Sequence, residues 1–147
     1  MTQPFGMISF DVNYGALTGG ERIPATRIER LFASAQRVLK CSGKRYVSIA
    51  FVNASAMKRL NEAYYGGEGV TDVLAFPAEG LSEAHGSLGE ILVYYPRAKQ
   101  QAKFRGISAR SEVELLVVHG LLHLLGYDHD TPRKKAAMFR LQETILK

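Results

Sequence analysis

An almost uninterrupted run of apolar residues, LLVVHGLLHLL, occupies positions 115–125 and constrains the fold more than any other feature of the chain. A helix built from this run has almost no polar face, and such a helix lies at the centre of a fold. A membrane-spanning helix needs about 20 apolar residues, so the run is too short to cross a bilayer. We therefore predict a core helix over residues 108–125 that holds two histidines, His119 and His123.

The rest of the chain alternates between two kinds of periodicity. Helical spacing of apolar residues predicts helices over residues 25–39, 57–64, 96–104 and 133–146, the second of them capped by Asn53 or Ser55. Runs rich in β-branched and aromatic residues predict strands over residues 5–14, 46–52, 71–77 and 88–95. At 147 residues, with no linker and no repeat, residues 1–147 are predicted to form one domain. The predicted class is α+β, with helices packed on a single small mixed sheet around the central apolar helix.

Three histidines are spaced so that they can meet at one point. His119 and His123 are four residues apart, which places both imidazoles on the same face of a helix. Gly126 follows the helix, where a left-handed residue turns the chain back, and His129 can then approach the same point. Burying two histidines without partners is costly, which favours a metal site over ordinary core histidines. Three imidazoles with a fourth position open are typical of catalytic zinc, so we predict one Zn²⁺ per chain.

The residue after the first histidine argues against a peptidase. Zinc peptidases with a similar H-x-x-x-H-x-x-G-x-x-H spacing place a glutamate there as the general base. This chain has Gly120 at that position. The base must therefore come from elsewhere in the chain, or the water on the metal serves instead.

The motif HGLLHLLGYDH, residues 119–129, resembles the signature of the YbeY family, bacterial zinc-dependent endoribonucleases that act in ribosomal RNA maturation and ribosome quality control. The segments LNEAYY, TDVLAFP and LGEI occur upstream in the family's order and at similar spacing. The similarity covers the chain from about residue 46 to its end. The resemblance implies that His119, His123 and His129 are the zinc ligands and that ribosomal RNA or ribosome particles are the partners.

Two positions depart from the family pattern. The family usually has arginine after the tyrosine of the LN-x-x-Y segment, where it lines the active-site cleft, and this chain has Tyr65. If that arginine contacts phosphate or stabilises charge in the family, this chain performs the function with another residue, performs it more weakly or lacks it. Tyr65 can stack on a base or simply pack at the rim, and both interpretations stay open. The second departure is mild, since Glu90 stands where aspartate is commoner.

Several acidic residues near the histidines are weaker candidates. Glu112 shares a helix face with His119 but lies about 10 Å away along the axis, so a catalytic role competes with stabilisation of the helix dipole. Asp128 and Asp130 flank His129 and either orient an imidazole or are solvated turn residues.

Cys41 and His85 are the other possible fourth ligands, but a lone cysteine is more often a small buried hydrophobe and His85 lies in a polar loop. We expect water or substrate in the fourth position. A single cysteine also fits a reducing compartment, and the first residues do not resemble a secretory signal, so a cytoplasmic location is expected.

The formal net charge of +5 modestly favours a polyanionic partner. No acidic residue occurs between Glu90 and Glu112, whereas Lys99, Lys103 and Arg105 do. These three are candidates for binding the RNA backbone, and an ordinary solvated helix face is the alternative.

The function predicted from the sequence is a zinc-dependent endoribonuclease that hydrolyses phosphodiester bonds in ribosomal RNA precursors. Two alternatives stay open. One is a ribosome-associated RNA-binding factor with a structural zinc, and the other is a metallohydrolase of a different substrate.

Overall fold

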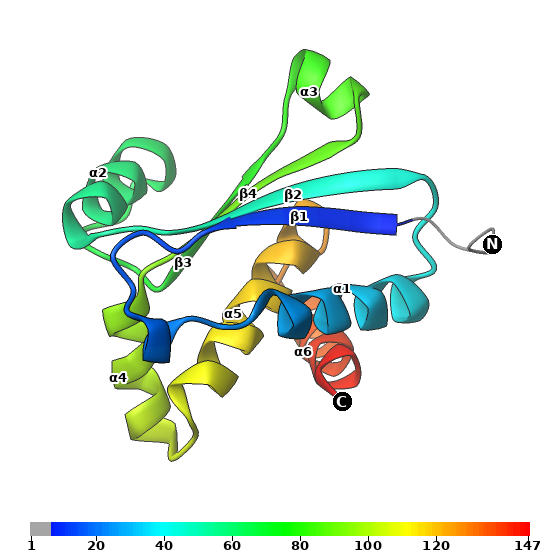
Figure 1. Cartoon of the computed structure of the whole chain (residues 1–147). Helices are drawn as coiled ribbons and strands as arrows, with labels where there is room; N and C mark the ends of the chain where they lie inside the picture. Colours follow the sequence, from blue (N-terminus) through cyan, green and yellow to red (C-terminus); the bar gives the residue numbers. More distant parts are fainter. Residues whose placement is uncertain (1–6) are drawn as a thin grey trace.

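The computed structural model describes residues 7–147, in which a twisted sheet lies against a layer of helices (Figure 1). The elements in chain order are β1 (Met7–Asn13), the 3-10 turn η1 (Gly19–Glu21), α1 (Ala25–Leu39), β2 (Lys44–Phe51), α2 (Ala54–Tyr65), β3 (Val73–Pro77), α3 (Gly80–Ala84), β4 (Ser87–Val93), α4 (Tyr95–Arg105), α5 (Ala109–Leu124) and α6 (Pro132–Leu146). The predicted α+β class with a single mixed sheet is confirmed.

The sheet has the strand order β1-β2-β4-β3. The strands β1, β2 and β4 are parallel, and β3 runs antiparallel to β4 at the edge of the sheet. Each parallel pair needs a long crossover, which α1 supplies between β1 and β2. β3 and β4 are instead joined by a short connection that contains α3.

Apolar side chains cover both faces of the sheet. On β4, Ile91 and Val93 belong to the main core, which α1, α5 and α6 complete, whereas Leu92 points to the opposite face. There Leu92 joins Leu74 of β3 and Met57 of α2 in a smaller cluster. This alternation follows from the two-residue period of a strand, so α2 and α5 lie on opposite sides of β3 and β4.

The predicted apolar helix is α5, and the structure confirms its central position. Ten of its residues are buried, in agreement with a helix that has no polar face. Gly120 lies at a close approach of α5 to β4, since a Cβ atom added there would come within 2.8 Å of Cγ2 of Ile91. No helix in residues 7–147 has the length and apolar character that crossing a membrane requires.

The other predicted elements agree with the structure apart from their ends and two omissions, the 3-10 turn η1 and the short helix α3. Asn53 rather than Ser55 caps α2, since its side chain accepts a hydrogen bond from the N–H of Ala56 at 2.8 Å. The short helix α3 lies in a segment that the sequence indicated only as a glycine-containing loop. Residues 5 and 6 of the predicted first strand lie outside the described residues.

Candidate metal centre

The end of α5 sets the direction of the loop that carries the third histidine. Gly126 has φ +97°, a left-handed conformation that favours glycine. Its N–H donates to the carbonyl of His123 at 3.0 Å, and the N–H of Tyr127 donates to the carbonyl of Leu122 at 2.9 Å. These two bonds are the pattern of a Schellman motif, so the predicted glycine turn is confirmed. The chain then returns along the helix and brings His129 back to it.

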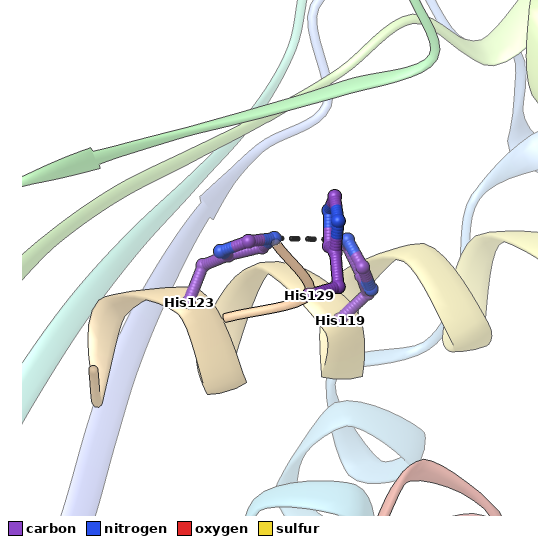
Figure 2. A group of neighbouring side chains, drawn as sticks. All are labelled: His119, His123 and His129. Atoms are coloured by element: carbon purple, nitrogen blue, oxygen red, sulfur yellow. Dashed lines mark hydrogen bonds between the residues drawn. The ribbon is translucent and has the colours of Figure 1, made fainter. Parts of the chain in front are cut away.

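The three imidazoles converge on one point above α5 (Figure 2). One nitrogen from each of His119, His123 and His129 lies within 4.8 Å of the other two. The Nε2 atoms of His119 and His123 are 3.1 Å apart. Two nitrogen ligands on a tetrahedral zinc ion are separated by about 3.3 Å, so this donor set has the chemistry and the spacing that such an ion requires.

A buried glutamine fixes the orientation of His119. The Nδ1–H of His119 donates to Oε1 of Gln142 on α6 at 2.6 Å, and Gln142 is only 3% exposed. With its proton on Nδ1, His119 presents the lone pair of Nε2 to the cluster. Sequence reasoning missed Gln142, although a polar residue beside Met138 and Ile145 on the buried face of α6 was a signal.

The surroundings of both helix histidines favour the neutral form, which is the form that binds metal. Burial lowers the pKa of His119, and the hydrogen bond to Gln142 only partly opposes this effect. Burial also lowers the pKa of His123, and the neighbouring rings of His119 and His129 lower it further. Neutral imidazoles keep a lone pair for an ion, so the surroundings of the cluster favour ligation at neutral pH.

The histidines form one wall of a pocket of about 490 Å³ between α5 and β3. The other wall is lined by Tyr65 and by residues of β3 and the preceding loop, namely Thr71, Asp72, Val73, Leu74, Ala75 and Pro77. Asp72 is the carboxylate in this lining, and the sequence analysis predicted no role for it. Its Oδ1 atom accepts a hydrogen bond from the N–H of Val73 at 2.7 Å, which holds the side chain at the start of the strand.

The free edge of β3 faces this pocket. The N–H of Tyr94 donates to the carbonyl of Asp72 at 2.8 Å. In the antiparallel register, every second residue from Asp72 onward therefore directs its backbone hydrogen bonds to β4. Ala75 has the opposite parity and directs its N–H and carbonyl to the free edge. The hydroxyl of Tyr65 donates a hydrogen bond to that carbonyl, which ties the last residue of α2 to the strand.

Glu112 and Arg105 bind each other rather than lining this pocket. Nη1 of Arg105 lies 3.2 Å from Oε2 of Glu112, whose side chain is fully buried. The lining of the histidine pocket includes neither residue. Burial raises the pKa of Glu112, and the charge of Arg105 opposes this shift.

The remaining candidates contribute no ligand atom to the histidine cluster in the described part of the chain, although the charge of Asp128 partly opposes the lowering of the pKa of His123 by burial. Lys99 and Lys103 are on α4, beside a separate shallow hollow. Asp128 accepts a hydrogen bond from the N–H of Asp130 at 3.1 Å, and Asp130 pairs with Lys134 at 3.4 Å. In residues 7–147 the cluster of possible ligands contains neither Cys41 nor His85.

An α+β fold with a three-histidine cluster beside an open pocket is typical of the class of mononuclear metal-dependent hydrolases. The family model described as Endoribonuclease YbeY matches residues 21–147. The chain belongs to this family, as the resemblance of its motif HGLLHLLGYDH to the family signature indicated.

Individual relatives agree with this assignment. The chain is 41% identical over 128 residues to "Endoribonuclease YbeY" of Geobacillus kaustophilus, covering 81% of this chain and 82% of that protein. It is 37% identical over 134 residues to the protein of the same name from Renibacterium salmoninarum, covering 86% and 85%. The solution structure of TM1509 from Thermotoga maritima superposes with a TM-score of 0.62 at 26% identity, covering 95% of this chain and 87% of that one.

Proposed function

We propose that residues 1–147 form one cytoplasmic hydrolase domain that cleaves phosphodiester bonds inside ribosomal RNA precursors and binds one Zn²⁺. The observation that carries this proposal is the position of His119, His123 and His129 in the wall of an open pocket. A structural zinc normally has four protein ligands, whereas this cluster offers three and faces a space large enough for substrate. Membership of the endoribonuclease family supplies the substrate class.

The zinc ion would polarise the scissile phosphodiester and lower the pKa of water. The protein supplies the positioning. Gln142 keeps the proton of His119 on Nδ1, so that Nε2 is available as a ligand. The N–H of Ala75, at the free edge of β3, is available to donate to a phosphate oxygen in the pocket. Asp72 lines the same pocket and is our candidate to accept a proton from the attacking water.

Within the described residues, no lysine or arginine lines the pocket between α5 and β3. Lys99 and Lys103 on α4 would bind the RNA backbone beyond the cleavage site, and Arg105 would add to this surface with the part of its side chain that Glu112 leaves exposed. Such contacts position the substrate without taking part in the bond cleavage.

The test is metal content and RNA cleavage of the purified protein beside two variants. We expect about one zinc per chain and cleavage of a ribosomal RNA precursor, with both lost in His119→Ala. His85→Ala is the matched control, because this histidine lies outside the cluster and both properties should survive its replacement. A His119→Ala protein that keeps its zinc would contradict the ligand assignment. A protein that binds zinc and precursor RNA but leaves the RNA intact would be a binding factor instead of a nuclease.

A further inference from the structure

Three aromatic rings gather where α2 meets β3, and one of them, that of Tyr65, lines the histidine pocket. Tyr64 is 70% exposed and Tyr65 is 51% exposed, although both contact Phe76. The ring of Tyr64 packs edge-on against Phe76 with centroids 5.4 Å apart, and Tyr65 packs at a tilt with centroids 5.5 Å apart. We call these three residues the rim aromatic cluster. Large aromatic side chains exposed together in this way are typical of a binding surface.

The ring of Tyr65 is held in place rather than free to turn into solvent. Its hydroxyl donates to the carbonyl of Ala75, and Phe76, the next residue of the same strand, supports one part of the ring. Tyr65 also belongs to the lining of the pocket that contains His119, His123 and His129. The strand that forms the pocket wall therefore also fixes the position of an exposed aromatic ring at the pocket's entrance.

An oriented ring at this place matches one part of an RNA substrate. A phosphodiester group in the pocket has a nucleobase attached through the sugar on each side. Exposed aromatic side chains bind unpaired bases by stacking, and they do so with little sequence preference because every base has a π-face. A base paired within a duplex cannot present its face to such a ring.

We propose that the rim aromatic cluster is a base-binding subsite. Tyr65 stacks on a nucleobase next to the bond that is cleaved, and Tyr64 extends the stacking surface along the RNA. This inference rests on the proposed nuclease function and adds the residues that hold the substrate. It assigns Tyr65 a binding role through its ring. The hydroxyl is already occupied by Ala75 and serves to position that ring.

The first experiment measures binding of a short single-stranded RNA that carries 2-aminopurine, recorded by stopped-flow fluorescence before cleavage proceeds. Stacking on Tyr65 quenches 2-aminopurine. We expect Tyr65→Leu to weaken binding about 5- to 100-fold and to abolish part of the quenching, since leucine keeps apolar bulk but has no flat π-face. Tyr65→Phe keeps the ring and should lose less than about threefold, because only the hydrogen bond to Ala75 is removed.

The matched control is Tyr46→Leu. Tyr46 is 39% exposed on β2 and is absent from the lining of the histidine pocket. Equal affinity and equal quenching in Tyr65→Leu and the unchanged protein would overturn the proposal. An equal loss in Tyr46→Leu would also overturn it, since the rings would then act as unspecific apolar surface.

A second measurement needs no variant and separates this subsite from the nuclease function itself. The unchanged protein is given two RNAs that differ only by removal of the base beside the cleaved bond. We expect KM for the abasic RNA to rise about 5- to 100-fold, and equal KM values would refute base stacking while leaving the nuclease function intact. If neither RNA is bound or cleaved, the proposed function fails, and the subsite fails with it.

Discussion

The Nδ1–H of His119 donates to Oε1 of Gln142 over 2.6 Å, and this hydrogen bond joins the histidine helix α5 to the C-terminal helix α6. The two residues are 23 positions apart in the sequence. A buried acceptor on the second ring nitrogen fixes both the tautomer and the orientation of a histidine ligand. The last helix of the chain is therefore part of the candidate metal centre.

Replacing Gln142 by alanine is expected to weaken zinc binding about 10- to 100-fold, because His119 loses the acceptor that sets its tautomer. Competition with a chromogenic chelator measures the affinity without any assay of activity. Gln142→Glu retains an acceptor at the same place and should bind zinc more tightly than Gln142→Ala. Equal losses in the two variants would mean that packing, not the hydrogen bond, is what Gln142 provides.

Asp72→Asn is expected to lower kcat about 100-fold or more while leaving zinc content unchanged, because asparagine retains the hydrogen bond to Val73 but cannot accept a proton. Cleavage rates at saturating RNA measure this effect. Asp11→Asn on β1 is the control, since it removes the same charge from the opposite edge of the sheet. An unchanged kcat in Asp72→Asn would show that the proton goes elsewhere.

Gly120→Ala is expected to lower the free energy of unfolding by about 1–2 kcal/mol, even though alanine favours a helix by about 1 kcal/mol over glycine. The added Cβ would lie 2.8 Å from Cγ2 of Ile91, a fully buried β-branched side chain with little freedom to move. Urea unfolding measures the change. If Gly120→Ala instead stabilises the protein, α5 and β4 are less closely packed than the structure shows.

Glu112 should make the stability of the protein depend on pH. Burial is the largest effect on its pKa and raises it above the ordinary value of 4.5, while the charge of Arg105 lowers it and that of Asp72 raises it. The folded state thus holds this proton more tightly than the unfolded chain. The resulting stability is lost as the pH rises from the ordinary value through the folded pKa.

Glu112→Gln removes this titration, so the variant should gain stability over the unchanged protein as the pH is raised from 4 to 7, and should differ little at the lower end. Urea unfolding across this range gives the difference. Glu62→Gln, on the exposed surface of α2, serves as the control. A difference in the free energy of unfolding that does not change with pH would contradict the raised pKa of Glu112.

The lysines of α4 are expected to contribute to RNA binding through charge alone. The double variant Lys99→Ala/Lys103→Ala should reduce the slope of log affinity against log salt by about 1.4, since each phosphate contact on a single strand contributes about 0.7. Filter binding at several salt concentrations measures it. Arg30→Ala/Arg37→Ala removes the same charge from exposed positions of α1. If both double variants change the slope equally, α4 is not a specific RNA surface.

Local sequence patterns correctly predicted those features of the protein that depend on residues close together in the chain. The spacing of His119 and His123 placed them on one helix face, and Gly126 marked the turn that returns His129 to them. The apolar run at residues 115–125 required a central helix, which α5 is. These predictions succeeded because a helix face and a glycine turn depend on residues only a few positions apart.

Only the tertiary structure decided which distant residues complete the site. It paired His119 with Gln142, brought Asp72 and the free edge of β3 opposite the histidines, and attached Tyr65 to Ala75. It also buried Glu112 against Arg105. Glu112, which the sequence offered as a catalytic candidate, is therefore not part of the pocket lining. Such contacts arise from the packing of α6, β3 and α2 around α5. Packing joins elements far apart in the chain, and the periodicity of a single segment carries no information about its partner.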